Sequence, residues 1–194
     1  MNDEKRIMDC DLSIEQRTVG DKTVPVLVGY AAVFGKRSMD LGGFTEEIAP
    51  GAFSESIRSD DIIAAVEHTP GLILGRLSAG TLRLVEDDKG LLFEVDLPNT
   101  GAGRDIQESV SRRDVKGASF KFRAVSDKWE KRDGMDHRTL LAAKLFDVGP
   151  VTFPAYPDTS VAMRSMAEWK LTTEPINLIA LYLKRQKHAE SLGR

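Results

Sequence analysis

The chain has 194 residues, of which 41% are hydrophobic and 29% charged, and its formal net charge at pH 7 is −3. This composition is typical of a folded globular protein, and the net charge gives no electrostatic reason for the whole surface to bind nucleic acid. No apolar run approaches the roughly twenty residues of a membrane span, so we expect neither nucleic acid nor a membrane among its partners.

The first part of the chain predicts short strands separated by turns, because apolar and polar residues alternate between clusters of glycine, proline and charged residues. The alternation is clear from Val24 to Tyr30. The predicted elements are strands over 9–17 and 23–34 with a turn at Gly20-Asp21, a loop over 35–43, a strand over 44–48, a helix from Pro50 to about Arg58, and strands over 61–68 and 72–77.

The middle of the chain predicts a β-hairpin and a helix. Residues 81–85 and 91–97 alternate around the polar turn 86–90. The residues on one face are Leu82, Leu84, Leu91, Phe93, Val95 and Leu97. After a break over 98–103, Ile106 and Val110 lie one helical turn apart and indicate the buried side of a helix over 104–113.

The last part predicts more strands and then helices. A strand is expected from Ala118 to about Val125, a second hairpin over 128–131 and 138–148 around Asp133-Gly134, and an extended connection over 149–154. Helices are expected over 161–171 and from Pro175 to about Glu190, with Thr173 as the cap of the second. Many short strands with a few helices predict an α+β fold, a closed or nearly closed and mostly antiparallel β-barrel with flanking helices. We divide it into a barrel domain over 1–160 and a helical tail over 161–194.

Ser119 is the candidate nucleophile. In an extended strand it lies on the face opposite to that of Ala118, Phe120 and Phe122. A serine nucleophile needs an imidazole that takes its proton and an acid that orients the imidazole. A serine beside glycine and alanine is otherwise an ordinary strand residue, so the interpretation depends on finding both partners.

His68 is the candidate base, because it ends an apolar strand just before Pro70 and its ring is expected to emerge at the strand end. A structural histidine is the alternative. His137 is expected at an exposed hairpin tip, and His188 in a solvated tail.

Asp147 is the candidate acid, since it interrupts the apolar segment 141–151 and a buried carboxylate needs a partner. The alternative is that it caps the turn at Gly149. Glu67 adjoins His68, but neighbours on a strand point to opposite faces, so it is a poor partner for that ring.

No cofactor is implied by the sequence. Cys10 is the only cysteine, which excludes an internal disulfide and a zinc site built mainly on thiolates. No spacing matches a zinc, calcium, phosphate-loop or dinucleotide signature.

Five segments in order resemble the HK97-type prohead proteases of tailed phages, over about Gly29–Val161. They are Gly29–Phe34, Glu47–Phe53, His68, Gly117–Phe120 and Phe146–Ala155. That family is similar in fold to the herpesvirus assembly proteases, so the resemblance implies a barrel of the herpesvirus-protease type. It also implies a serine endopeptidase that cleaves the scaffold segment of the major capsid protein, and itself, inside the procapsid in the host cytoplasm.

Carried over by position, the resemblance makes Ser119 the nucleophile, His68 the general base and Asp147 the acid, where the herpesvirus enzymes use a second histidine. It implies a homo-oligomer, a dimer by analogy. We expect the oxyanion hole to use backbone N–H groups of Gly149 and Val151, because Pro150 has none.

Two alternatives stay open. One is a catalytically silent capsid-assembly or scaffolding module that keeps the barrel for binding, and the other is a generic β-barrel binding protein with Ser119, His68 and Asp147 far apart. A wrongly assigned acid would be recognised by a contact of Glu67 or His137 with His68.

Overall fold

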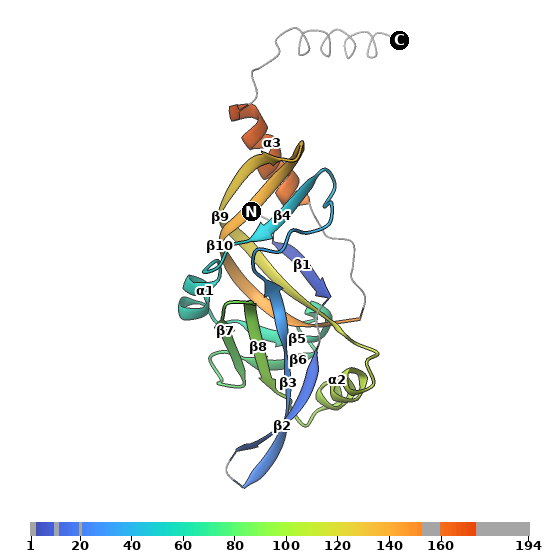
Figure 1. Cartoon of the computed structure of the whole chain (residues 1–194). Coiled ribbons are helices and arrows are strands. Elements are labelled where there is room, and N and C mark those ends of the chain that lie inside the picture. Colours follow the sequence, from blue (N-terminus) through green and yellow to red (C-terminus); the bar gives the residue numbers. More distant parts are fainter. Residues whose placement is uncertain (1–2, 10–11, 20, 153–159, 174–194) are drawn as a thin grey trace, which may run out of the picture.

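Two β-sheets make up most of the molecule in the computed structural model, which describes residues 3–9, 12–19, 21–152 and 160–173 (Figure 1). The larger sheet has the order β1-β9-β10-β5-β6, with β4 also paired to β10. Its strands are β1 (Glu4–Asp9), β4 (Phe44–Ile48), β5 (Ile63–Ala65), β6 (Ile73–Arg76), β9 (Gly117–Arg132) and β10 (Met135–Val151).

The smaller sheet is antiparallel, with the order β2-β3-β8-β7. Its strands are β2 (Ser13–Val19), β3 (Lys22–Val33), β7 (Leu82–Glu86) and β8 (Gly90–Asp96). The helical elements are α1 (Ser54–Ser59), the 3-10 turn η1 (Val66–His68), α2 (Gly101–Ser111) and α3 (Ser160–Thr173). None of the helices in the described ranges is long and apolar enough to cross a membrane.

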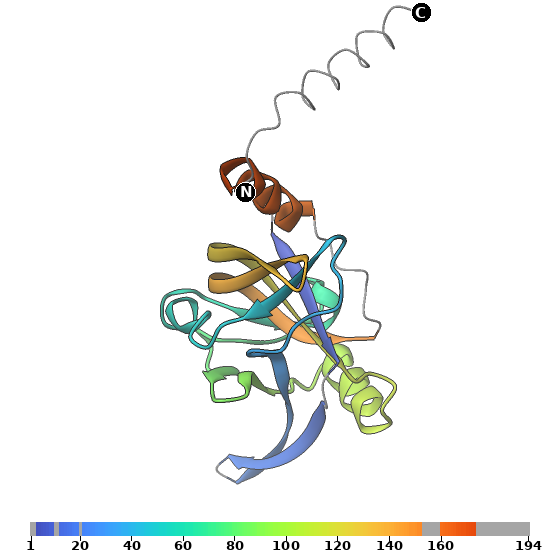
Figure 2. The same cartoon turned by 45° about the horizontal axis from the view of Figure 1, so that its top comes forward.

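The core lies between the two sheets and joins them. Leu27 of β3 and Phe93 of β8 belong to the same buried cluster as Phe120 and Phe122 of β9. Burying a side chain of this size contributes roughly 2 kcal/mol to stability. A second, smaller cluster joins Phe44 and Trp129 to Ala162 and Met166 of α3, which lies at one end of the molecule (Figure 2).

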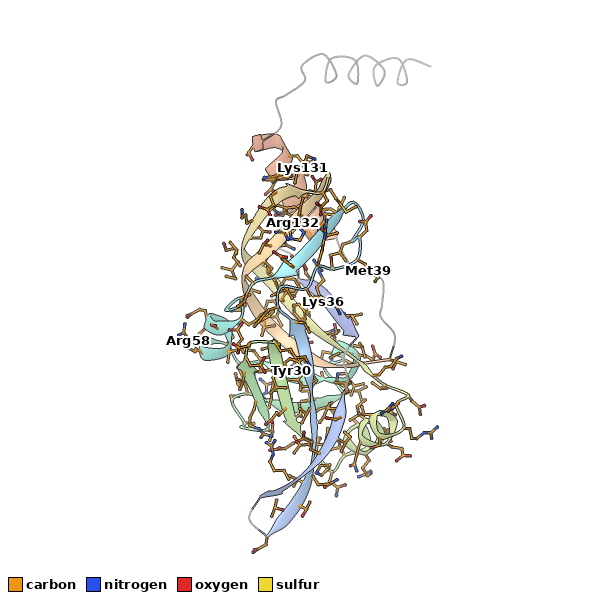
Figure 3. All side chains as sticks on the ribbon, in the orientation of Figure 1. Tyr30, Lys36, Met39, Arg58, Lys131 and Arg132 are labelled. Atoms are coloured by element: carbon orange, nitrogen blue, oxygen red, sulfur yellow. The ribbon has the colours of Figure 1, made fainter. Side chains whose placement is uncertain are left out.

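Large apolar side chains are mostly turned inward in both sheets. Met39 and Val125 are among the few that are exposed, and Figure 3 shows Met39 on the loop that precedes β4. The α+β prediction is confirmed, but the predicted closed barrel is not seen. Strand pairing within the described residues gives two separate sheets, which the shared core, and not hydrogen bonding around a ring, holds together.

Several predicted elements have the right type and shifted bounds. The strand over 44–48, the hairpin of β7 and β8, and a helix over 161–171 are present. The helix predicted over 104–113 begins earlier because the Thr100 hydroxyl accepts a hydrogen bond from the Gly103 N–H. The strands expected over 118–125 and 128–131 are one continuous strand, β9, and β10 runs on through Val151.

Two predicted strands were wrong in their bounds. The strand expected over 9–17 lies instead at 13–19 as β2, and residues 4–9 form a strand that was not predicted, β1, on the edge of β9. The strand predicted over 61–68 ends at Ala65. The helix predicted over 175–190 lies outside the described residues, as do His188 and the end of the connection over 149–154.

Candidate active site

Ser119 lies near the start of β9 between two neighbouring strands. It is paired with Ile7 of β1 on one side and with Gly149 of β10 on the other. The expected alternation of β9 is present, since Ala118, Phe120 and Phe122 belong to the core. Ser119 itself is also buried, with 0% of its surface exposed.

His68 contacts Ser119 on the face of β9 that is turned away from Ala118, Phe120 and Phe122. It is placed there by a turn, and not by the end of a strand as predicted. After Ala65 the chain turns, and Glu67 and His68 have φ values of 52° and 56°. Left-handed backbone is rare for residues other than glycine and often marks a functional site. The prediction that His68 ends a strand is therefore corrected.

Gly149 allows this turn to lie close to β10. A Cβ atom at Gly149 would lie 2.0 Å from the carbonyl oxygen of Ala65, the last residue of β5. Only a residue without a side chain permits so close an approach of two backbones. The glycine therefore fixes where η1, and with it His68, lies relative to β10.

A β-bulge directs Asp147 toward His68. Leu145 pairs with Phe122 and Asp147 pairs with the next residue, Lys121, so Phe146 is an extra residue in β10. Without the bulge Asp147 would share the core face of Leu145. With it, Asp147 lies on the same side of the sheet as Ser119.

The three predicted side chains are in contact. His68 Nε2 lies 2.7 Å from Ser119 Oγ, and His68 Nδ1 is hydrogen bonded to Asp147 Oδ1. The side chains of His68 and Asp147 are 7% and 10% exposed. An aspartate that accepts the Nδ1 proton leaves Nε2 as the acceptor that a serine hydroxyl requires.

The other candidate partners of His68 lie elsewhere. The Glu67 carboxylate accepts a hydrogen bond of 2.6 Å from the Thr152 N–H. His137 is fully buried and not at an exposed hairpin tip, with Nδ1 2.8 Å from Thr45 Oγ1 and Nε2 3.5 Å from a Glu47 carboxylate oxygen. Burial and the nearby Arg132 charge lower the pKa of His137, which favours its neutral form.

Gly149 and Val151, the expected oxyanion-hole residues, belong to the end of β10 and pair with Ser119 and Gly117 of β9. Their backbone is therefore next to the serine. Among the residues that the structure describes, no group of three histidine, cysteine or acidic side chains is placed to hold a metal ion.

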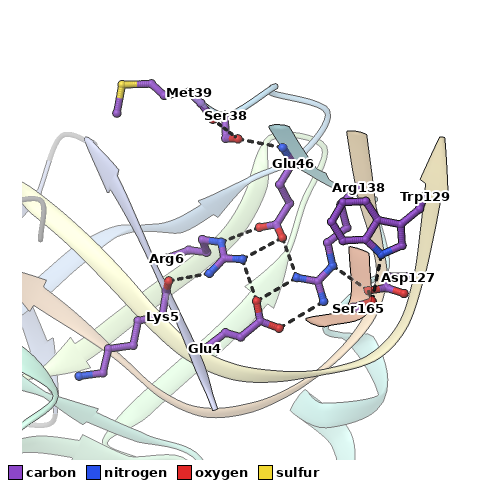
Figure 4. Close-up of polar contacts among 10 residues, drawn as sticks. All are labelled: Glu4, Lys5, Arg6, Ser38, Met39, Glu46, Asp127, Trp129, Arg138 and Ser165. Carbon is purple, nitrogen blue, oxygen red and sulfur yellow. Dashed lines mark hydrogen bonds and ion pairs between the residues drawn. The ribbon is translucent and has the colours of Figure 1, made fainter. Parts of the chain in front are cut away.

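The structure contains a buried cluster of four charged side chains that the sequence analysis did not predict (Figure 4). The Arg6 guanidinium donates to both carboxylate oxygens of Glu46, at 2.7 and 3.0 Å, and at 2.8 Å to Glu4. Arg138 donates to Glu4 and Glu46, each at 2.9 Å. All four side chains are buried. The signal was the pair of opposite charges at Glu4 and Arg6, but every residue from Asp3 to Arg6 is charged, which is also the pattern of an exposed strand.

The two arginines of this cluster remain charged in spite of their burial. Burial on its own lowers the pKa of Arg6 and of Arg138, but the attraction of Glu46 and Glu4 outweighs it and raises both above their usual value. Both guanidinium groups therefore stay charged. The four-residue cluster joins β1 to β4 and β10 at the edge of the candidate site.

Comparison with known proteins places most of the chain in one family. Residues 11–172 match the family described as caudovirus prohead serine protease. Among solved structures, the bacteriophage T4 capsid assembly protease is similar with a TM-score of 0.49 and 9% sequence identity, covering 77% of this chain and 99% of that chain. No curated protein matches the chain.

Proposed function

The chain belongs to the caudovirus prohead serine proteases and is a serine peptidase of capsid maturation, and we propose that Ser119, His68 and Asp147 are its catalytic residues. Its proposed substrate is the scaffold segment of the major capsid protein, together with its own chain. The supporting observation is the unbroken series of contacts from Asp147 through His68 to Ser119.

In the proposed first step, His68 Nε2 takes the hydroxyl proton while Ser119 Oγ bonds to the scissile carbonyl carbon. Asp147 keeps the proton on Nδ1 and stabilises the imidazolium that forms. The negative charge develops on the former carbonyl oxygen, to which the backbone N–H groups of Gly149 and Val151 would donate hydrogen bonds. The C–N bond then breaks, and His68 gives its proton to the leaving amine.

The second step removes the acyl group. His68 takes a proton from water as the water oxygen bonds to the acyl carbon, and the ester bond to Ser119 Oγ breaks. His68 returns a proton to Ser119, so the enzyme ends in its starting state. One peptide bond and one water become one carboxylic acid and one amine.

Co-expression with the capsid precursor tests this proposal. The chain and its Ser119→Ala variant would each be produced with the precursor of the phage that encodes it, and the products identified by mass spectrometry. We expect defined cuts with the unaltered chain and an intact precursor with the variant.

Ser126→Ala is the matched control, since Ser126 is an exposed serine of the same strand. Cleavage by Ser119→Ala would refute the assignment of the nucleophile. Precursor left intact by the unaltered chain, with assembly changed, would favour the silent scaffolding module instead.

The remaining parts of the proposal concern assembly. The protease would act inside the procapsid in the host cytoplasm, as a homodimer, with a fold related to that of the herpesvirus assembly proteases. We keep the division into a protease domain over 1–160 and a tail over 161–194. Light scattering of the purified chain, and of a variant ending at residue 173, tests whether self-association depends on the part of the tail that follows α3.

A further inference from the structure

β1 covers the edge of β9 that carries Ser119. Six consecutive pairs join the two strands, from Glu4 with Phe122 to Asp9 with Gly117. Within the described residues β9 is the only strand that β1 pairs with. Without β1, the first residues of β9 would be a free edge able to pair with another extended segment.

The backbone of β1 competes with His68 for the serine proton. The Ser119 hydroxyl donates a hydrogen bond of 2.8 Å to the carbonyl oxygen of Arg6, while its oxygen lies 2.7 Å from His68 Nε2. A hydroxyl has one proton to donate. While Arg6 accepts that proton, His68 cannot take it, so the nucleophile is not activated.

β1 also leaves no space for a substrate. Ser119 is 0% exposed, so the carbonyl carbon of a peptide cannot approach its oxygen while β1 is in place. The Arg6 carbonyl turns its oxygen, and not its carbon, toward the hydroxyl, which is not a geometry for attack. A serine peptidase with this site must open it before it can cleave a substrate.

We propose that the β9 edge beside Ser119 is the substrate-binding edge, that β1 occupies it as a self-inhibiting strand, and that an extended segment of the capsid precursor replaces β1. This inference rests on the proposed role of Ser119 and adds how the substrate is recognised. Addition of a peptide strand to a sheet edge obtains affinity from backbone hydrogen bonds and specificity from alternate side chains. The family match begins at residue 11, so β1 lies outside the matched core.

The side-chain preference of this edge follows from the charge cluster (Figure 4). If β1 leaves, Arg138 keeps Glu46 and also Asp127, to which its Nε donates at 2.7 Å. Glu4 and Arg6 leave together, so no net charge is removed. A segment that replaces them in the same register places an acidic residue against Arg138 and a basic residue, two positions later, against Glu46. The carbonyl of that basic residue then lies beside Ser119.

A reversible lock on β1 tests the proposal in the full chain. Lys5 and Lys121 are paired directly across β1 and β9, and Lys5 is exposed. The variant Lys5→Cys/Lys121→Cys in a Cys10→Ser background allows a disulfide between the strands. The reaction of Ser119 with a fluorophosphonate, in which the serine oxygen replaces fluoride on phosphorus, is followed by mass spectrometry.

We expect the oxidised form to label at least tenfold more slowly than the reduced form, and to cleave the capsid precursor correspondingly more slowly. The single variant Lys5→Cys in the same background should show no such redox dependence. Equal labelling of the oxidised and reduced forms, with the disulfide verified, would overturn the proposal. Absence of any Ser119 adduct under all conditions would instead refute Ser119 as the nucleophile.

Loosening β1 gives the opposite test. Glu4→Ala/Arg6→Ala leaves Arg138 paired with Glu46 and Asp127, so no buried charge loses all its partners. We expect this variant to label at least tenfold faster than the unaltered chain. A labelling rate unchanged in a folded double variant would contradict the proposal.

Two peptides of equal composition test the side-chain preference on the loosened variant. One carries the order Glu-Lys-Arg-Ile of β1 and the other the swapped order Arg-Lys-Glu-Ile. We expect the first to slow labelling at concentrations at least tenfold lower, and to be cut slowly after arginine. Equal competition by the two peptides would rule out recognition through Glu46 and Arg138.

Discussion

The two ends of the β9–β10 hairpin use the same pair of strands for different purposes. At one end Ser119 and Asp147 meet His68 of η1. At the other end Trp129 contacts α3 and His137 contacts β4. The backbones differ accordingly, because pairing is regular from Met135 to Leu140, whereas a bulge interrupts it just before Asp147.

This difference teaches that the irregular end provides chemistry and the regular end provides stability. A bulge and a glycine contact aim side chains at a point that regular strands cannot reach. They also leave that end dependent on a few positions. We therefore expect changes at the Ser119 end to reduce turnover in a folded protein, and changes at the turn end to reduce stability with less effect on turnover.

The largest expected effect is that of Ser119→Ala. Loss of the nucleophile removes covalent catalysis altogether, which in serine proteases costs about 10⁶ in kcat. Cleavage of the capsid precursor at fixed enzyme concentration measures it, with circular dichroism to establish folding. A variant that unfolds, or that still cleaves within tenfold of the original rate, would contradict the comparison.

Asp147→Asn should have the next largest effect. The amide keeps the size of the side chain but donates where the carboxylate accepts, so it favours the wrong imidazole tautomer, at a cost of about 10⁴ in kcat. The measurement is the rate of precursor cleavage and of fluorophosphonate labelling. Glu67→Gln is the control, because the carboxylate of Glu67 contacts the Thr152 N–H. Equal losses in the two variants would leave the acid unassigned.

Gly149→Ala should reduce turnover without changing any of the three proposed catalytic side chains, because it acts only on the distance between two backbone segments. The added Cβ would meet the Ala65 carbonyl oxygen at 2.0 Å, so η1 must move away from β10. Misplacement of His68 by about 1 Å is expected to reduce kcat about 100-fold. Gly71→Ala, where no atom lies within 4 Å of an added Cβ, is the control. Similar rates for both variants would mean that this close approach does not position His68.

The sequence was sufficient to select Ser119, His68 and Asp147, because residue type and resemblance narrow the choice to a few positions. How these side chains meet could not be predicted. The bulge at Phe146 and the left-handed backbone of Glu67 and His68 have no local signal in residues that are neither glycine nor proline. The tight turn depends on the distant Gly149.

Long-range contacts explain the other differences between prediction and structure. Glu4 and Arg6 have the pattern of a solvated segment, and their burial is tolerable only because Glu46 and Arg138 are placed to pair with them. His137 belongs to a polar segment that predicts an exposed tip, yet β4 pairs with this part of β10 and buries it. Such partners are far away in sequence, so a local pattern does not contain them.

Trp129→Ala tests the stability of the turn end. The indole packs on Phe44 with ring centroids 5.1 Å apart, and its Nε1 donates to Ser165 Oγ of α3. Loss of a buried aromatic side chain is expected to lower the free energy of unfolding by about 3 kcal/mol. Urea unfolding measures it, and Val125→Ala, which alters a 69% exposed residue of the same strand, should change it by less than about 0.5 kcal/mol. If Trp129→Ala reduced turnover by more than it reduced the fraction of folded protein, the turn end would also contribute to catalysis, which would contradict the proposed difference between the two ends.

The smallest expected effect is a pH dependence of stability from His137. Its pKa in the folded protein lies below the ordinary value because of burial and the Arg132 and Arg37 charges, although Glu47 partly opposes this. The unfolded chain therefore binds more protons than the folded one below about pH 6.5, so acidification from pH 7.5 to 5.5 should destabilise the fold. The carboxylates of Asp136 and Glu47, whose pKa values are lowered, lose their contribution to stability only at lower pH, near or below the ordinary values of 3.8 and 4.5. His137→Asn retains a polar partner for Thr45 and removes the titrating ring, so its melting temperature should fall less over this interval. If the melting temperature changed equally with pH in both proteins, the pH dependence would arise from another group, and His137 would not be its cause.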